Sequence, residues 1–250
     1  MERIGLLGFG VDIGGSGIKG AKVDLAAGVL ASERARLATP QPSTPEAVAR
    51  VVKDLVEAFA WTGPMGCTFP AAVTGGVART AANVERSWIG TDIGALMGSA
   101  TGCDVTAVND ADAAGLAEVT FGAAKGAEGL VLVTTLGTGI GTALIYDGVL
   151  VPNCELGHLE VGGIEGEAFA SSAARTRDNL SWVEWSAGLG RYLRAVEDLL
   201  WPDLIVVGGG VSKKADRFLP LLELRTPVVA AKLRNEAGII GAAVLGATRS

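Results

Sequence analysis

The feature of this chain that most constrains its fold is a strand, glycine turn, strand pattern that occurs once in each half. In the first copy, an apolar run enters the glycine turn 14–20, and an alternating segment follows. In the second copy, the apolar run 129–136 ends in the glycine turn 137–141, and a further strand follows. Glycine turns can direct backbone N–H groups at an anion. The repeat therefore predicts a strand-turn-strand hairpin in each half, and two such hairpins can converge on one polyanionic chain.

The first turn matches a dinucleotide fingerprint, GxGxxG, at 15–20. That motif requires a helix directly after the turn, whereas the residues that follow here alternate with period two. The pattern favours a hairpin whose turn amides face a phosphate. Asp12, at the end of the first strand, is a candidate to position Mg²⁺ or a water, and the alternative is an Asx-turn residue. The candidate phosphate ligands of this hairpin are Gly14, Gly15, Ser16, Gly17 and Lys19.

An Asn-Asp pair lies between the two hairpins, after an apolar run at 103–108 and before a segment with helical spacing. Asn109 and Asp110 therefore sit at a strand-to-helix junction. Open α/β sheets bind ligands at the carboxyl ends of their strands. The alternative is capping, because Asn and Asp are preferred N-caps of a following helix.

A third glycine loop follows the apolar strand 204–207 and precedes an expected helix. Its backbone donors and its lysines could bind phosphate, although lysines on a solvated face are an equal alternative. The second hairpin adds a threonine hydroxyl to its glycine amides. The candidate phosphate ligands in this half are Gly137, Thr138, Gly139, Gly209, Gly210 and Lys213.

The polar residues between the second hairpin and the third loop suit the recognition of hydroxyl groups. Glu155 and His158 would share a helical face, and Glu167 follows in a glycine-rich acidic stretch. Carboxylates accept hydrogen bonds, and a neutral imidazole both donates and accepts. Zinc is not expected, because Cys154 has no CxxC partner or second histidine beside it. Asn83, in the long polar loop 80–88, could also bond a hydroxyl or form a turn.

The bulk composition excludes several classes of partner. The formal net charge is −6 and no long basic run occurs, which argues against a general nucleic-acid binder. The three cysteines are an odd number at wide spacing, which favours a reducing compartment. The first residues fit neither a signal peptide nor a membrane span, so we expect a cytoplasmic protein with no membrane partner.

Taken together, five segments resemble the ROK (repressor, open reading frame, kinase) family of sugar kinases. They are 12–20, 109–111, 136–141, 155–158 and 235–238. Four further segments look like the polyphosphate-using glucokinase branch of that family: 68–70, 81–84, 201–203 and 208–214. Most ROK kinases carry a cysteine-rich zinc motif after the histidine. The segment 161–167 has no cysteine, and this branch also lacks the motif.

The resemblance implies a two-lobed actin-like (ribonuclease H-like) α/β sugar kinase fold with an interdomain cleft. Residues 1–108 would form a small domain to which the helix 238–250 returns, and 109–237 a larger one. Asp110 would be the general base on the 6-hydroxyl of glucose, with sugar ligands Asn83, Asn109, Glu155, His158 and Glu167. The implied donor is inorganic polyphosphate, with or without ATP, used with Mg²⁺ and no zinc.

Alternatives to this reading remain at the level of the sequence. One is a strictly ATP-dependent glucokinase or glucomannokinase of the same family. A sugar-sensing regulator is not expected, because the first strand begins by residue 4 and leaves no room for an N-terminal helix-turn-helix. The family suggests a homodimer. The sequence does not show whether Lys19, Lys213, Lys214, Lys232 and Arg234 form one channel.

Overall fold

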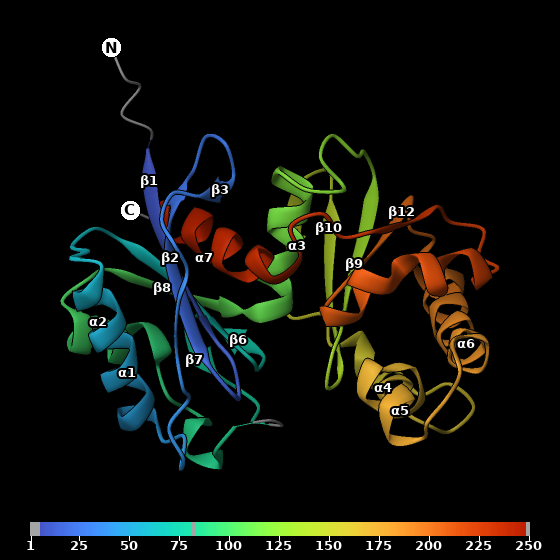
Figure 1. Cartoon of the computed structure of the whole chain (residues 1–250), viewed down its shortest axis with the longest axis horizontal. Helices are drawn as coiled ribbons and strands as arrows, with labels where there is room; N and C mark the ends of the chain where they lie inside the picture. Colours follow the sequence, from blue (N-terminus) through green and yellow to red (C-terminus); the bar gives the residue numbers. More distant parts are fainter. Residues whose placement is uncertain (1–5, 82–83, 249–250) are drawn as a thin grey trace. The chain divides into compact units, whose positions relative to one another are not determined.

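The computed structural model describes residues 6–81 and 84–248. Its backbone contacts divide the chain into two compact units, each built on its own sheet (Figure 1). Unit 1 comprises 1–117 and 236–250, and unit 2 comprises 118–235. The expected α/β class is confirmed. The domain division at 108/109 and the cleft expected between the lobes stay predictions.

Unit 1 is built on a six-stranded sheet in the order β3-β2-β1-β5-β8, with β4 also paired to β2. The strands are β1 (Leu7–Ile13), β2 (Ile18–Asp24), β3 (Val29–Leu30), β4 (Ala35–Leu37), β5 (Met65–Phe69) and β8 (Val105–Asn109). β1 and β2 form the expected antiparallel hairpin, while β5 runs parallel to both β1 and β8. The carboxyl ends of β1, β5 and β8 therefore lie at one edge of the sheet, where ligands are expected.

Unit 1 contains the helices α1 (Pro45–Ala58), α2 (Ile93–Thr101) and α7 (Ala237–Thr248). It also contains residues 110–117 of α3 (Asp110–Thr120), whose last turn is assigned to unit 2. Between α1 and α2 lie the short hairpin β6 (Val73–Thr74) and β7 (Val77–Ala78) and the 3₁₀ turn η1 (Arg86–Trp88). Thr44 caps α1, since its hydroxyl accepts from the Ala47 N–H. α7 packs directly on the sheet, and a side chain at Gly10 or Gly66 would collide with its backbone.

Unit 2 is built on a five-stranded sheet in the order β11-β10-β9-β12-β13. The strands are β9 (Leu130–Leu136), β10 (Ile140–Tyr146), β11 (Val149–Val151), β12 (Leu204–Gly208) and β13 (Val228–Ala230). β9 and β10 form the second expected hairpin, and β12 is parallel to β9 and β13. Asp147 and Gly148 turn the chain between β10 and β11 with φ of 48° and 81°, as a two-residue hairpin loop requires.

The helices of unit 2 are α4 (Gly166–Ala170), α5 (Ser172–Arg177) and α6 (Trp182–Leu200), with 3₁₀ segments η2 (Leu156–His158), η3 (Gly210–Arg217) and η4 (Leu219–Leu221). The 3₁₀ turn η5 (Arg234–Glu236) leads into α7. The apolar spacing of 182–200 before Pro202 predicts a helix, and α6 has these bounds, with a capping box of Ser181 and Glu184 at its start. The helix expected after the third glycine loop is instead the 3₁₀ segment η3. Ser212 donates both its N–H and its hydroxyl to the Gly209 carbonyl, which tightens the first turn.

In the part of the chain that the structure describes, each helix is too short or too polar to cross a lipid bilayer.

Candidate active site

Hairpin 1 consists of β1, the turn 14–17 and β2. Its turn is held by hydrogen bonds to the backbone carbonyl groups of the turn residues. Gly14 donates its N–H to the Gly17 carbonyl at 3.1 Å. The Thr39 hydroxyl donates to the Gly14 carbonyl at 2.5 Å, and Arg36 Nη2 donates to the Ser16 carbonyl at 2.9 Å. The Gly14 N–H is engaged within the turn, so the N–H groups that the turn can offer to an anion are those of Gly15, Ser16 and Gly17.

Arg36 and Thr39 are contributors to hairpin 1 that the sequence reasoning missed. A Cβ at Gly17 would lie 2.6 Å from Arg36 Nε, so glycine leaves the space that the guanidinium occupies. Arg36 belongs to β4, which has only three residues and pairs Arg36 with Lys19 of β2. So short a strand gives little alternating signal in a sequence.

Asp12 and Lys19 pair across hairpin 1, and a third residue completes their environment. Lys19 Nζ lies 2.9 Å from Asp12 Oδ2, and the side chains are 27% and 19% exposed. The hydroxyl of Thr68, from β5, donates to Asp12 Oδ1 at 2.9 Å. Both carboxylate oxygens are therefore bound by neighbouring strands, an arrangement that differs from the Asx turn left open as an alternative.

Asn109 occupies the junction between β8 and α3 and caps the helix. Its Oδ1 accepts from the N–H groups of Ala111 at 2.8 Å and Asp112 at 3.0 Å. Its Nδ2 donates to the Ala71 carbonyl at 3.0 Å, and the residue is 7% exposed. The capping alternative thus holds for Asn109. An amide nitrogen has two N–H donors, so the second Nδ2 donor is what Asn109 can offer a sugar hydroxyl.

Asp110 is the first residue of α3 and is half-buried. Its Oδ1 accepts from the Ala111 N–H at 2.9 Å. In the sheet, Asp12 is level with Thr68 of β5, which is level with Val108 of β8. Strands are about 4.8 Å apart, which places β1 and β8 about 10 Å apart. Unit 1 therefore brings Asp12 and Asp110 to the same edge of one sheet.

Hairpin 2 consists of β9, the turn 137–139 and β10. Its turn is held by a hydrogen bond from α5, a helix outside the sheet. Gly137 donates to the Gly139 carbonyl at 3.0 Å, and the Gly137 carbonyl accepts from the Ala173 N–H of α5 at 3.0 Å. Gly137 and Thr138 are exposed at the tip. The third glycine loop lies against the base of this hairpin. Gly209 has φ of 79°, and a Cβ there would collide with the Leu136 backbone.

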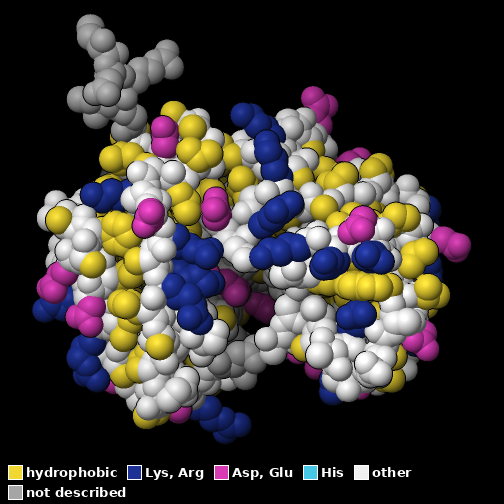
Figure 2. Space-filling view, in the orientation of Figure 1, with side chains coloured by type: hydrophobic (Ala, Val, Ile, Leu, Met, Phe, Trp, Pro, Cys, Tyr) yellow, Lys and Arg dark blue, Asp and Glu magenta, His cyan; other side chains and the backbone are white. Residues whose placement is uncertain are grey.

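Basic side chains gather on one face of each unit (Figure 2). In unit 1 they lie over β2, the strand that carries Lys19. In unit 2 they lie over the part of the chain that Figure 1 colours orange-red, which contains η3. Lys213 and Lys214 of η3 are exposed. Lys213 therefore lies on a solvated face near the third glycine loop, so both interpretations of the lysine pair remain open.

A cluster of His158, Glu165 and Glu167, termed the His158 cluster, lies beside hairpin 2. His158 Nδ1 is 3.7 Å from Glu165 Oε2 and 3.9 Å from Glu167 Oε1. Glu167 Oε2 also accepts from the Ile140 N–H at 3.3 Å and contacts Gly139. Glu165 was missed in the sequence, because nothing in its spacing sets it apart from neighbouring acidic residues.

Glu155 precedes η2, and its carbonyl accepts from the His158 N–H at 3.2 Å. Its side chain is exposed, and it is not among the three residues whose ligand atoms form the His158 cluster. Asn83 lies outside the described residues. The glycine-rich stretch beside Glu167 packs on Tyr192 of α6. Burial raises the pKa of Tyr192, and the charge of Glu167 raises it further.

The His158 cluster is also the set of described residues whose geometry could hold a metal ion. One nitrogen and two carboxylate oxygens lie within 4.8 Å of one another. His158 and Glu165 are exposed, and exposed acidic groups commonly lie together without an ion. The expectation of no zinc stays a prediction.

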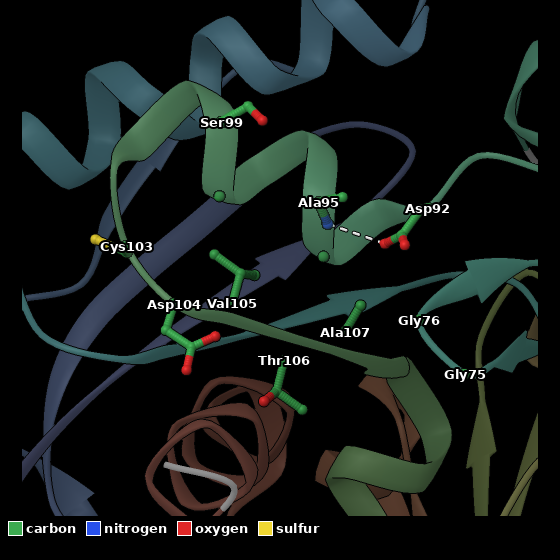
Figure 3. Close-up of a pocket in the computed structure, with 12 residues that line it drawn as sticks. Gly75, Gly76, Asp92, Ala95, Ser99, Cys103, Asp104, Val105, Thr106 and Ala107 are labelled. Carbon is green, nitrogen blue, oxygen red and sulfur yellow. Dashed lines mark hydrogen bonds between the residues drawn. The ribbon is translucent and has the colours of Figure 1, made fainter.

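A hollow of about 490 Å³ lies on unit 1 between α2 and the amino end of β8 (Figure 3). Figure 3 shows Val105 pointing toward α2, while Asp104 and Thr106 point the other way. Asp92 is engaged as the cap of α2, since it accepts from the Ala95 N–H at 2.9 Å. The lining contains none of the expected site residues. We therefore place the candidate site at the carboxyl edge of the sheet and at the hairpins.

The fold and these motifs define a family. The ROK family model matches residues 8–168, and the chain belongs to the ROK family. The resemblance found in the sequence is thereby confirmed, as is the actin-like α/β sugar kinase fold class, which rests on the solved structures below.

The chain is similar to particular members of that family. The polyphosphate glucokinase of Mycobacterium tuberculosis (strain ATCC 25618 / H37Rv) is 54% identical over 241 residues, which cover 95% of this chain and 90% of that protein. The crystal structure of the inorganic polyphosphate/ATP-glucomannokinase from Arthrobacter sp. strain KM matches with a TM-score of 0.94 and 54% identity, over 98% of this chain and 99% of that one. A ROK family glucokinase from Streptomyces griseus, in complex with glucose and AMPPNP, matches with a TM-score of 0.83 over 96% of this chain and 99% of that one. Its identity is 24%, so it shows the fold alone.

Proposed function

We propose that this chain is a polyphosphate glucokinase, an enzyme that transfers a phosphoryl group from inorganic polyphosphate to the 6-hydroxyl of glucose. The observation that carries the proposal is the 54% identity, over 95% of the chain, to a relative of that activity. The structural relative at the same identity is a polyphosphate/ATP-glucomannokinase, so ATP is proposed as a second donor and mannose as a second acceptor.

Asp110 is proposed as the general base on the sugar hydroxyl. Phosphoryl transfer passes through a loose transition state, in which the attacking oxygen forms little bond early. A carboxylate with an ordinary pKa of about 3.9 is a weak base at neutral pH. Asp110 therefore orients the hydroxyl and accepts its proton late in the reaction.

The two hairpins are proposed to bind the phosphoryl donor through their turn amides, with Lys19 and Thr138 adding side-chain donors. The third glycine loop and Lys213 are proposed to bind more distant phosphates. Mg²⁺ prefers oxygen ligands, and Asp12 has a carboxylate beside the turn of hairpin 1. Each of its oxygens keeps a lone pair besides the one bound by Lys19 or Thr68, so this residue fits the metal and would hold it. When bound with the donor, Mg²⁺ neutralises charge on the transferred phosphoryl group.

The sugar hydroxyls are proposed to bind Glu155, His158 and Glu167, with the remaining Nδ2 donor of Asn109. His158 and Glu167 already contact one another, so they can act as one polar surface. Glu167 also bonds hairpin 2 through the Ile140 N–H. Asn83 is proposed as an additional ligand on the basis of the family resemblance.

The test is a coupled assay that detects glucose 6-phosphate, run with polyphosphate and with ATP on the same preparation. We expect turnover with polyphosphate that depends on Mg²⁺ and is abolished by a chelator. Activity with ATP alone would contradict the polyphosphate proposal and favour the strictly ATP-dependent alternative. Mannose replaces glucose in a parallel series that detects mannose 6-phosphate. We also propose that the chain forms a homodimer, which light scattering tests.

A further inference from the structure

We infer that Thr68 is a positioning residue, which holds the Asp12 carboxylate in the orientation needed for phosphoryl transfer. The inference rests on the proposed function, in which Asp12 and Lys19 lie beside the transferred group. Thr68 is fully buried on β5, and its hydroxyl donates to Asp12 Oδ1 at 2.9 Å.

The sheet register brings Thr68 to this carboxylate. Asp12 is level with Lys19 on one neighbouring strand and with Thr68 on the other. Residues that are level on adjacent strands present side chains to the same face. The three polar groups therefore form one row across β2, β1 and β5, with Asp12 in the centre.

Lys19 and Thr68 each bind a different oxygen of the Asp12 carboxylate, and together they restrict its rotation more than either does alone. Lys19 binds Oδ2 through a long, flexible side chain that is 27% exposed, so it constrains the plane of the carboxylate weakly. Thr68 is β-branched, and its χ1 is restricted in a strand, so its hydroxyl direction is set by the backbone. The carboxylate plane is thus determined by β5, a strand outside hairpin 1.

The neighbours of Thr68 perform a different task. Cys67 is fully buried and belongs to the apolar core, and the Phe69 ring packs 4.3 Å from that of Trp88. Side chains alternate between the two faces of a strand, so these residues lie on the opposite face from Thr68. Replacing Thr68 by valine changes the hydroxyl to a methyl group at the Asp12 face and leaves that core in place.

The test compares Thr68→Val and Thr68→Ser with the wild-type chain. We expect kcat with polyphosphate to fall about tenfold in Thr68→Val, the scale of one hydrogen bond to a charged group. Glucose affinity, measured by calorimetry, should stay within twofold. Thr68→Ser keeps the hydroxyl and should recover most of the lost kcat, which a purely packing role would not explain.

A double-mutant cycle with Asp12→Asn tests whether Thr68 acts through Asp12. We expect Thr68→Val to lower kcat by less than twofold further when Asp12 is already asparagine. Thr226→Val is the matched control, because Thr226 is a buried threonine of unit 2 whose hydroxyl donates to the Pro202 carbonyl at 3.0 Å. It should keep the wild-type kcat.

Three results would overturn the inference: wild-type kcat in Thr68→Val, no recovery in Thr68→Ser, or full additivity with Asp12→Asn. Should Thr68→Val fail to fold by circular dichroism, Thr68→Ala replaces it in the same cycle. Absence of glucose phosphorylation by the wild-type chain with either donor would instead overturn the proposed function. The two failures are therefore distinguishable.

Discussion

The two hairpins share one backbone plan and differ in the charge beside their turns. In hairpin 1, the second pair before the turn is Asp12 with Lys19. In hairpin 2, the corresponding pair is Thr135 with Gly141. The first hairpin thus carries an ion pair where the second is neutral. Hairpin 1 carries its carboxylate on its own strand, whereas the carboxylate that contacts the turn of hairpin 2 belongs to Glu167, which follows that hairpin in the sequence.

The turns are also held in different ways. Arg36 and Thr39, from β4 and the segment after it, bind the carbonyls of the first turn. The second turn is bound by Ala173 of α5 and contacts Glu167 of the His158 cluster. Hairpin 1 therefore carries charged side chains, and residues of unit 1 hold its turn. Hairpin 2 instead contacts Glu167, one of the residues proposed to bind the sugar. Changes in hairpin 1 should affect the donor alone, and changes in hairpin 2 should affect both substrates.

The largest effect should come from the proposed base in the unit that carries hairpin 1. We expect Asp110→Asn to lower kcat by about 10² to 10⁴, because general-base catalysis contributes on that scale, while glucose binding is kept. Steady-state kinetics and calorimetry measure the two quantities. Asp104→Asn is the control, since Asp104 is an exposed aspartate before the other end of β8. Unchanged kcat in Asp110→Asn would remove Asp110 from the role.

Next in size is the cation of hairpin 1. Lys19→Met removes the ammonium group that binds Asp12 Oδ2 and that is proposed to donate a hydrogen bond to the phosphates of the substrate. Hydrogen bonds to charged groups contribute about 1.5–3 kcal/mol, so kcat/KM for polyphosphate should fall about 10- to 100-fold, with the KM for glucose unchanged. Lys22→Met, on the same strand and its other face, is the control. An equal change in the KM for glucose would break the division of tasks between the hairpins.

A smaller effect is expected from a change in hairpin 2, and it should alter the KM for glucose. A Cβ at Gly139 would collide with the Glu167 carboxylate, which must then shift and weaken its bond to the Ile140 N–H. Loss of about 1 kcal/mol gives a rise of about fivefold in the KM for glucose in Gly139→Ala. Gly137→Ala has nothing within 4 Å of its Cβ, so there the KM for glucose should not change. Equal values in the two variants would contradict the link through Glu167.

The smallest effect is a difference in thiol labelling between the units. Burial raises the pKa of the Cys67 thiol in unit 1, and the Asp12 charge adds to it, so Cys67 should resist a disulfide reagent at pH 8. Cys154 of unit 2 is half-buried and should react first. Because Cys154 precedes Glu155, glucose should slow its labelling. Cys154→Ser should remove the fast phase, and its persistence would show that another thiol is exposed.

Local patterns were enough for much of the fold. The apolar face of 182–200 and the proline that follows it predict a helix, and α6 has the same bounds. The two hairpins were predicted because glycine turns and alternation act over a few neighbouring residues. The helix after the third glycine loop was predicted less well, since the bonds from Ser212 to Gly209 select a 3₁₀ turn.

The sequence by itself determined which elements form, where the glycine turns fall and which family the chain resembles. The tertiary structure decided that the Asn109 Oδ1 accepts the capping bonds of α3. It also decided which distant residues belong to the candidate site, namely Thr68, Arg36 and Glu165. The physical reason is distance along the chain. Thr68 meets Asp12 across 56 residues, through a strand register that no local pattern of side chains encodes.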